Sequence, residues 1–496
     1  MSLVVVSNRI AKVRANEPIA GGLASALLPV VRTSGAIWVG SSGRVRDASH
    51  KDSFAEIEAF GAGAIATVDL PAASYRGYYE GFSNSVLWPA LHSRPDLIRA
   101  TQDDYRCYRD INAFMARGLL RFCRADSTYW IHDYHFLTLG AELRRLRVTR
   151  PLGFFLHTPW PTRSTMLSVP HHRELVEAML AYDLIGFQTD DDRVNFADYV
   201  ANELGLDVVD GLVMSGRDTS VVASSHGVSR LGVFPIGIDV ETFASRAARA
   251  VTRHEFARLR TSLQGVKLAI GADRVDYSKG LENRIRAFDR MLVTQPALRG
   301  EVSMLQIAVP SRCQIPAYGQ LHRDLAALVG EVNGRHGEVD WVPVRYVNKG
   351  YAQSTLAGYY RVAQVGLVTP LHDGMNLVAK EYVAAQNPAD PGVLVLSEFA
   401  GAAKELDAAV LVNPHDIDGM AQAFARALYM SADERRARWT AMMAKLRANT
   451  VQGWFADFVR ALQQTHADNA VSAAPMAEPP TLWPRRSANT GGARYH

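Results

Sequence analysis

The sequence has little of several features that would assign a functional class at once. Its 496 residues include three cysteines, Cys107, Cys123 and Cys313, without CxxC spacing. This argues against a disulfide framework and is typical of a reducing, cytoplasmic compartment. No apolar run reaches the roughly 18 residues needed to span a bilayer, so no membrane partner is expected. The opening MSLVVVSNRI has no basic stretch or cleavage site, and we interpret it as a strand rather than a signal peptide.

Common nucleotide and nucleophile motifs are also missing. No G-x-G-x-x-G follows the first predicted strand, and neither a Walker loop nor a G-x-S-x-G elbow occurs. These absences weaken dehydrogenase, kinase and serine-hydrolase interpretations. Basic and acidic residues nearly balance, 54 against 50, for a net charge of +4. Spread over this length, that charge gives no argument for a nucleic-acid partner, and none is expected.

Short apolar segments alternate with longer helical patterns, which is typical of parallel sheets flanked by helices. One series of strand candidates runs from 3–7 to 231–237, and a second runs from 267–274 to 409–414, with one member at 339–344. We therefore predict an α/β fold of two doubly wound, Rossmann-like domains, 1–236 and 237–450, facing each other across a cleft. A hairpin or loop is expected at 208–230, and a disordered tail at 470–496, which is rich in proline, alanine and glycine.

The stretch HDGMNLVAKEY at 372–382 follows the apolar, β-branched run 364–370, which predicts a strand, a tight turn and a helix. Such turns, at the carboxyl ends of parallel strands, bind ligands in open α/β sheets. Free N–H groups at the helix start suit a phosphate. Asp373 and Glu381 suit neutral hydroxyl groups, as on a sugar. The expected ligand therefore carries a phosphate close to hydroxyl groups.

A second informative stretch is GADRVDYSKGLENRI at 271–285, where Arg274 and Lys279 lie near the carboxyl end of the strand predicted at 267–274. Two cations there can hold a diphosphate, arginine as a two-pronged donor and lysine as a point charge. Alternatively, they are surface cations on a loop. The similar strand–turn–helix at 364–382 favours the phosphate interpretation.

The N-terminal half supplies weaker candidates. Arg9 directly follows the first strand, and Gly21 and Gly22 either let the backbone approach a ligand or merely form a turn. Asp133 ends the strand at 128–133, so its carboxylate is expected near the cleft, and Arg312 is expected to face it from the second domain. Two aromatic side chains are either core residues or part of this site: Tyr79 and Trp88.

Metal ligands are present only in weak patterns. Histidines occur in HDYH at 132–135, at His157 and at 171–172, but without the short paired spacings of a zinc site. Asp190 and Asp192 in TDDDR could hold Mg²⁺. They also precede a helical pattern, and capping of that helix is the simpler interpretation. We therefore predict no metal site.

The chain resembles the trehalose-6-phosphate synthase family of retaining glucosyltransferases in motifs that occur in order between about residues 3 and 465, among them LVVVSNRI, FSNSVLWPALH, WIHDYHFL, GFFLHTPWP, RVDYSKGL and TPLHDGMNLVAKEYVAAQ. The resemblance implies the GT-B architecture, whose last helix, here about 451–465, crosses back to the N-terminal domain. It implies glucosyl transfer from UDP-glucose to glucose 6-phosphate, giving α,α-trehalose 6-phosphate, with no metal and no cofactor beyond the UDP-glucose co-substrate. The expected partners are small molecules, the expected role is stress protection in the cytoplasm, and a homo-oligomer is left open.

The resemblance also assigns roles to individual residues. The catalytic residues it implies are Arg274, Lys279, Asp373, Asp133 and His157, the last beside O6 of the transferred glucose. For the donor it implies contacts from Gly21, Gly22, Arg274, Lys279 and Asp373, from Tyr351 near the uracil, and from the helix start at Leu377, Val378, Ala379, Lys380 and Glu381, with Glu381 on the ribose. For the acceptor it implies Arg9, Tyr79, Trp88, Asp133 and Arg312, with the arginines on its phosphate.

One position departs from the family pattern. The family usually has W-x-G-W where this chain has WVGSSG, with Ser41 in place of a tryptophan at the acceptor pocket. That change leaves room for another phosphorylated acceptor, such as glycerol 3-phosphate. An alternative of another class is an inactive sugar-phosphate sensor. Such a protein would be expected to lose at least one of four donor-site residues, but all are retained: Arg274, Lys279, Asp373 and Glu381. Because no second acid is evident beside Asp133, the resemblance implies front-face transfer rather than a covalent glycosyl-enzyme.

Overall fold

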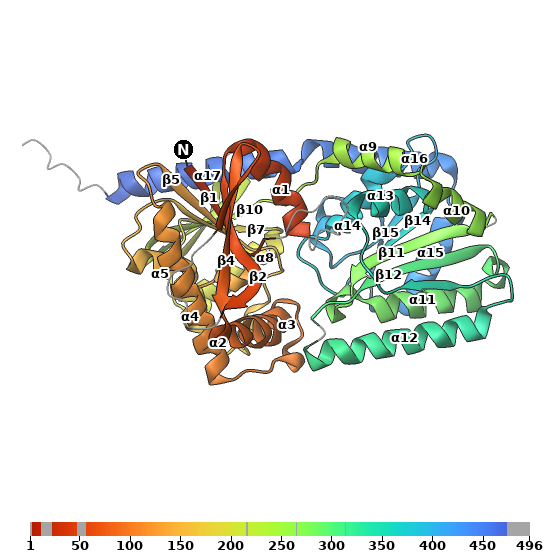
Figure 1. Ribbon diagram of the computed structural model, residues 1–496, viewed down its shortest axis with the longest axis horizontal. Helices are drawn as coiled ribbons and strands as arrows, with labels where there is room; N and C mark the ends of the chain where they lie inside the picture. The colour runs from red at the N-terminus through yellow and green to blue at the C-terminus, as the bar shows by residue number, and fades with distance from the viewer. Residues whose placement is uncertain are drawn as a thin grey trace, which may run out of the picture.

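The computed structural model describes residues 2–10, 22–46, 56–214, 217–263, 265–312 and 314–473, which form two sheets flanked by helices (Figure 1). The first sheet has ten strands, in spatial order β3 (Glu56–Phe60), β4 (Gly63–Pro71), β2 (Ile37–Arg46), β1 (Ser2–Arg9), β5 (Ser127–His132), β6 (Leu152–Phe155), β7 (Leu184–Phe187), β10 (Gly227–Val233), β9 (Arg217–Ser224) and β8 (Val208–Met214). The second has six: β13 (Val344–Val347), β12 (Val302–Val309), β11 (Lys267–Arg274), β14 (Val365–Val368), β15 (Val393–Ser397) and β16 (Val410–Val412).

The helices divide between the two sheets. We use the term N-terminal lobe for the first sheet with α1 (Gly22–Ser34), α2 (Ala72–Arg76), α3 (Trp88–Leu91), α4 (Gln102–Leu119), α5 (Leu139–Arg145), α6 (Arg163–Met166), α7 (His172–Met179) and α8 (Asp190–Glu203). The C-terminal lobe is the second sheet with α9 (Val240–Ala250), α10 (His254–Leu263), α11 (Leu281–Thr294), α12 (Pro316–His336), α13 (Gln353–Val362), α14 (Leu377–Ala385), α15 (Ile417–Tyr429) and α16 (Ala432–Ala448). The last described helix, α17 (Val451–Ala473), follows these.

Strand β1 shows why the apolar runs become central strands. Val4 and Val6 belong to one hydrophobic core and Val5 to the other, and all three are fully buried. A strand covered on both faces must be apolar throughout, and β-branched side chains fit the pleated surface. The six strands of the second sheet all pair in parallel, as do β4, β2, β1, β5, β6, β7 and β10 of the first. The predicted doubly wound α/β architecture is confirmed.

Three local expectations can be compared with the structure. The segment 208–230 is an antiparallel meander of β8, β9 and β10, in agreement with the predicted hairpin. The strand expected at 339–344 is wrong, because pairing begins only at Val344, and Pro343 just before it lacks the N–H of a ladder residue. Residues 470–473, which were expected in a disordered tail, instead belong to α17, which continues to Ala473. Residues 474–496 lie outside the described part.

Helix α17 lies along the first sheet, as Figure 1 shows for the long blue helix. The ring of Trp454 lies 4.8 Å from that of Trp130 in β5, and Phe458 stacks on the same indole at 4.6 Å. The chain therefore passes between the lobes twice, at 234–239 and at 448–451, and the two passages meet in a parallel bridge between Ile238 and Thr450.

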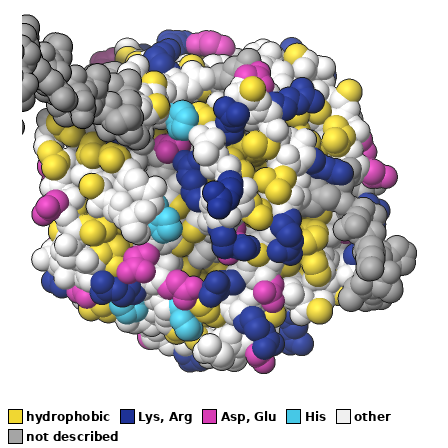
Figure 2. All heavy atoms as spheres, turned by 90° about the vertical axis from the view of Figure 1, so that its left-hand side faces the viewer, with side chains coloured by type: hydrophobic (Ala, Val, Ile, Leu, Met, Phe, Trp, Pro, Cys, Tyr) yellow, Lys and Arg dark blue, Asp and Glu magenta, His cyan; other side chains and the backbone are white. Residues whose placement is uncertain are grey.

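The outer face of the N-terminal lobe is charged. Figure 2 shows lysine and arginine side chains gathered in a band there, with acidic and histidine side chains among them. Of the helices in the described ranges, none has both the length and the apolar character needed to cross a membrane.

Candidate active site

The site residues predicted from the sequence gather where the carboxyl ends of the two parallel sheets meet. Two contacts bring the lobes together there. The guanidinium carbon of Arg312, after β12, lies 3.9 Å from the ring centre of Trp88 in the N-terminal lobe. The hydroxyl of Ser93 lies 3.3 Å from Nδ1 of His372, just before the predicted ligand turn. Ligands of open α/β sheets bind at such carboxyl edges.

The turn between β14 and α14 is built around Asp373. Its Oδ2 lies 2.5 Å from Nζ of Lys279 and accepts a 3.0 Å hydrogen bond from the side-chain amide of Asn376. Asn376 has a left-handed backbone and caps α14, with its side-chain oxygen accepting from the N–H of Ala379. Burial alone would raise the pKa of Asp373, but Lys279 and Asn376 together hold it below the ordinary value. The carboxylate therefore stays charged and fixed in direction.

Arg274 is a cation of this site whose side chain forms no ion pair among the described residues. It ends β11, and its guanidinium carbon lies 5.6 Å from the ring centre of Trp88 in the other lobe. Apart from this ring contact, its side chain makes no hydrogen bond or ion pair within the part of the chain that the structure describes. Its charge does help to lower the pKa of the buried Asp276. With Lys279 and the first N–H groups of α14, it forms a concentration of positive charge suited to a diphosphate.

Helix α14 places its first residues beside both lobes. A side chain on Gly22 of α1 would come within 3.0 Å of Leu377, so the start of α1 lies against the start of α14. Gly21 lies outside the described residues. Glu381 accepts a 3.1 Å hydrogen bond from Gln353 at the start of α13, and burial raises the pKa of its carboxyl to about 7.

Three further residues predicted at the donor site lie on or near α14. Val378 and Ala379 occupy its first turn beside Leu377. Tyr351 lies two residues before α13, with its ring edge-on to Tyr359 at 5.2 Å. The Tyr351 ring is therefore close in the chain to Gln353, the partner of Glu381.

The side chain of Lys380 has a structural role that the sequence did not reveal. Its side chain is buried and turned toward the inter-lobe passage, where Nζ donates to the carbonyl of Ile236 at 2.6 Å and contacts Glu405. Glu405 also accepts from Asn449 at 2.6 Å, in the second passage. Only the backbone of Lys380 therefore remains available for the predicted donor contact.

The acceptor-side aromatics lie on or directly after a long π-helix, η1 (Gly77–Leu87), which the sequence did not predict. The N–H of Trp88 at its end donates to the carbonyl of Ser83, five residues earlier. Such segments are rare and often lie at functional sites. The ring of Tyr79 stacks between those of Tyr75 and His135, at 5.5 and 6.0 Å. Tyr79 lies on this segment, and Trp88 follows it as the first residue of α3. Trp88 is 6% exposed while contacting cations of the other lobe.

Asp276 is a site residue that sequence reasoning missed. In the sequence it lies between Arg274 and Lys279, and it is fully buried. Its carboxylate lies 3.4 Å from Arg312 and accepts a hydrogen bond from the indole N–H of Trp88 at 3.4 Å. Burial opposes its charge, but the arginines and Lys279 hold the pKa of Asp276 below the ordinary value.

Arg312 itself is partly committed to this network. It donates to Tyr318 at 2.7 Å and Tyr134 at 3.2 Å, and its Nε–H is buried without a hydrogen-bond partner among the described residues. Its backbone is left-handed, at φ 50°, which is uncommon outside glycine and typical of functional loops. The unpaired N–H is available to an anionic ligand.

Asp133 and His157 lie side by side after β5 and β6. Oδ1 of Asp133 accepts from the N–H of His157 at 3.4 Å, and Asp133 has a strained φ of 77°. Burial raises the pKa of the Asp133 carboxyl to about 6, and lowers that of His157 to about 3. A side chain on Gly374 would approach the carbonyl of His157 within 2.4 Å, so the lobes touch here without side chains. The predicted catalytic acids, Asp133 and Asp373, are thereby brought to the same junction.

His157 is held within a chain of buried polar groups. Its Nε2 lies 3.0 Å from Nδ1 of His132, and its Nδ1 lies 3.3 Å from the amide nitrogen of Gln188. These contacts fix the orientation of the neutral ring.

The remaining acceptor candidates lie at the ends of β1 and β2. Arg9 ends β1 and is exposed, and it is in register with Ser41 of β2. Ser41 is 4% exposed, and its hydroxyl accepts from the N–H of Gly43 at 3.0 Å. The side chain of Ser41 therefore stabilises the local loop.

The acidic run at 190–192 caps a helix, which was the simpler of the two interpretations. Thr189 and Asp192 form a reciprocal capping box at the start of α8, and Asp190 pairs with Arg193 at 2.8 Å. Within the described ranges, no group of three or more histidine, cysteine, aspartate or glutamate side chains could hold a metal ion.

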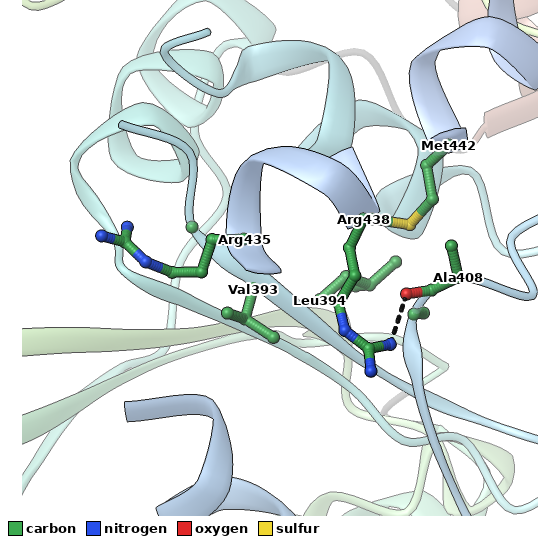
Figure 3. A pocket seen from close by; sticks show the side chains of 8 residues that line it. Val393, Leu394, Ala408, Arg435, Arg438 and Met442 are labelled. Atoms are coloured by element: carbon green, nitrogen blue, oxygen red, sulfur yellow. Dashed lines mark hydrogen bonds between the residues drawn. The ribbon is translucent and has the colours of Figure 1, made fainter. Parts of the chain in front are cut away.

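Figure 3 shows a small pocket elsewhere in the C-terminal lobe, lined by residues of β15 and α16. Arg438 donates to the carbonyl of Ala408 at 2.9 Å, and Arg435 to that of Pro391 at 2.6 Å. Both guanidinium groups tie α16 to neighbouring loops. The pocket is therefore a packing feature and does not belong to the site described above.

Comparison with known proteins gives consistent matches over nearly the whole chain. Glycosyltransferase family 20 is matched over residues 3–464. The trehalose-6-phosphate synthase of Sinorhizobium fredii is 44% identical over 465 residues, covering 93% of this chain and 98% of the relative. That of Enterobacter sp. is 42% identical over 463 residues, covering 93% and 95%.

Solved structures agree. A UDP-forming α,α-trehalose-phosphate synthase from Burkholderia xenovorans, in complex with glucose-6-phosphate, is 44% identical, with a TM-score of 0.89 and coverage of 93% of this chain and 100% of that one. The Escherichia coli trehalose-6-phosphate protein bound with UDP-2-fluoro glucose is 40% identical, with a TM-score of 0.86 and coverage of 94% and 99%.

Proposed function

The chain belongs to glycosyltransferase family 20 and has its GT-B fold, and we propose that it transfers glucose from UDP-glucose to glucose 6-phosphate, giving α,α-trehalose 6-phosphate and UDP. The observation that carries this proposal is the convergence of the unpaired Arg274, the Lys279–Asp373 pair and the start of α14 on one turn opposite Trp88. Related structures named for this activity hold glucose-6-phosphate or a UDP-glucose analogue.

On the donor side, fixed positive charge stabilises the departing diphosphate. Arg274 and Lys279 approach it as side chains, and the first N–H groups of α14 approach it along the helix dipole. Asp373, held by Lys279 and Asn376, presents its other oxygen to hydroxyl groups of the transferred glucose. Glu381, whose carboxyl has its pKa raised to about 7 by burial, suits the ribose hydroxyls.

On the acceptor side, Arg312 and Arg9 take the phosphate of glucose 6-phosphate, between Tyr79 and Trp88. The buried, unpaired Nε–H of Arg312 supports this assignment. Asp133, beside His157, contacts the acceptor sugar.

Retention follows from a front-face displacement. The bond between C1 of glucose and the diphosphate oxygen breaks, and the attacking acceptor hydroxyl forms its new bond to C1 on the same face. The hydroxyl proton passes to the departing diphosphate oxygen. Asp373 is already paired with Lys279, which makes it a poor partner for Asp133 in a two-carboxylate mechanism. The protein therefore contributes placement and electrostatic stabilisation.

We propose further that the reaction needs no metal ion or other cofactor and takes place in the cytoplasm on small-molecule substrates. The small number of cysteines and the lack of CxxC spacing support a reducing compartment.

The function is tested by crossing UDP-, GDP- and ADP-glucose with glucose 6-phosphate and glycerol 3-phosphate, and measuring nucleotide release. We expect release to be fastest with UDP-glucose and glucose 6-phosphate. Faster release with glycerol 3-phosphate would contradict the proposed acceptor, and no release with any acceptor would contradict an active glucosyltransferase.

A further inference from the structure

The ends of β1 and β2 are both irregular at the same level of the first sheet. The pairing of β1 with β2 shifts register between Ser7 and Arg9, and that of β2 with β4 shifts between Ser41 and Val45. Bulges of this kind turn a side chain away from its regular direction and occur next to active sites. Here they bring the side chain of Arg9 over the backbone of Gly43.

Gly43 leaves a space that Arg9 occupies. A Cβ atom at Gly43 would lie 2.8 Å from both Nε and Nη2 of Arg9 and 2.9 Å from its Cζ. The contact is with the far end of a flexible side chain, so a methyl group there would displace the guanidinium rather than the backbone. Gly43 also has a φ of 81°, a conformation that glycine adopts readily.

The loop that carries Gly43 is held in place by Asp69 at the end of β4. The hydroxyl of Ser42 accepts from the N–H of Arg44 at 3.0 Å and hydrogen-bonds with the Asp69 carboxylate. Arg44 and Arg46 lie 3.5 and 3.6 Å from the same carboxylate. Because both neighbours of Gly43 are anchored, the loop cannot easily retreat if a side chain is added.

Arg9 is also the residue to which the proposed function assigns the acceptor phosphate, together with Arg312. Its charge partly offsets the rise that burial causes in the pKa of Tyr75, whose ring stacks on the acceptor candidate Tyr79 at 5.5 Å. A change in the place of the guanidinium over Gly43 is therefore expected to affect acceptor binding.

We propose that Gly43 is a positioning residue for acceptor binding: its missing side chain leaves the space in which the Arg9 guanidinium is held toward the phosphate of the acceptor. This inference rests on the proposed function. It assigns to Gly43 an effect on the acceptor alone, because the charged donor groups, Arg274, Lys279 and Asp373, belong to the other lobe.

The test compares Gly43→Ala with Gly35→Ala, measuring KM for glucose 6-phosphate and for UDP-glucose separately. Gly35 is a matched control, since its φ of 75° is equally strained for alanine but the nearest atom to a Cβ there is 3.8 Å away. Loss of a charge-assisted contact predicts a rise in the acceptor KM on the order of tenfold to a hundredfold in Gly43→Ala. The donor KM should change little, and Gly35→Ala should leave both constants near those of the wild type.

A double variant separates positioning from a structural effect. In an Arg9→Ala background, Gly43→Ala should raise the acceptor KM no further, because the guanidinium that it displaces is already absent. A further rise equal to that in the wild-type background would overturn the inference, as would an unchanged acceptor KM in Gly43→Ala. If Gly43→Ala does not fold, folding of the double variant would support the steric argument and its failure would refute it. A wild-type chain inactive with glucose 6-phosphate would instead contradict the proposed function.

Discussion

Replacing Lys279 by alanine should lower both stability and turnover, for separable reasons. Its Nζ lies 2.5 Å from Oδ2 of Asp373, and the two side chains are 12% and 9% exposed. Removing one partner of a buried pair typically costs 3–5 kcal/mol. Asn376 still donates to the same oxygen at 3.0 Å, so we expect the free energy of unfolding to fall by about 3 kcal/mol at neutral pH.

The pH dependence of that loss has a defined sign. In the wild type the pKa of Asp373 lies below its ordinary value, so its contribution to stability is present above that ordinary value and is lost as the pH falls through the folded value. In Lys279→Ala, burial is no longer offset by the ammonium, and the pKa of Asp373 should exceed its ordinary value. The variant should therefore recover stability relative to the wild type as the pH is lowered, in urea unfolding at a series of pH values.

Turnover should fall independently of stability. Loss of one preorganised group at the leaving diphosphate is worth about 3–4 kcal/mol, or roughly a hundredfold to a thousandfold in kcat. The double variant Lys279→Ala/Asp373→Asn should regain most of the lost stability without regaining activity. Lys404→Ala is a matched surface control, because its pair with Asp191 is more than half exposed and should matter little to either quantity. A kcat near that of the wild type in Lys279→Ala would refute the role assigned to this cation.

Three other substitutions test separate parts of the site. Trp88→Leu removes the ring 3.9 Å from Arg312, and the acceptor KM should rise about tenfold in initial-rate assays, with a smaller rise in the donor KM because Arg274 lies farther from the ring, at 5.6 Å. Because burial has raised the pKa of Glu381, the ligand-free wild type should lose at most about 3 kcal/mol of stability as the pH rises through about 7. Glu381→Gln should abolish this loss. Asp192→Ala removes one half of the capping box of α8 and the acceptor for the N–H of Trp160 at 2.8 Å, and should cost about 2 kcal/mol in denaturant unfolding. If a metal chelator destabilised the wild type by the same amount, Asp192 would be a metal ligand, and this would contradict the capping role.

Local signals in the sequence were sufficient for the ligand turn. The β-branched run predicted at 364–370 is β14, and the helix expected after the turn begins at Leu377 with Asn376 as its cap. Strand, turn and cap each depend on neighbouring residues, so periodicity and turn chemistry can reveal them. The approach of Lys279 to Asp373 spans 94 positions and is a property of the sheet order. This contact could be anticipated only from the shared carboxyl edge of parallel strands and from the family resemblance.

What the sequence could not predict depends on tertiary structure. The π-helix η1 has no distinctive sequence period, and it forms where Gly77 and Gly81 allow close packing on α4. Asp276 looks like an ordinary loop acid until its burial against Arg312 and Trp88 is known. Lys380 follows the predicted helix start as expected, but its long side chain reaches away from the ligand to the carbonyl of Ile236, in a segment 144 positions earlier.

The central claim is that Arg274, Lys279 and the start of α14 stabilise the departing diphosphate without a metal ion. The most direct measurement is the rate of UDP release from UDP-glucose and glucose 6-phosphate in excess EDTA, followed by addition of excess magnesium. We predict the same rate in both conditions. Activity that disappears with EDTA and returns with magnesium would contradict the account.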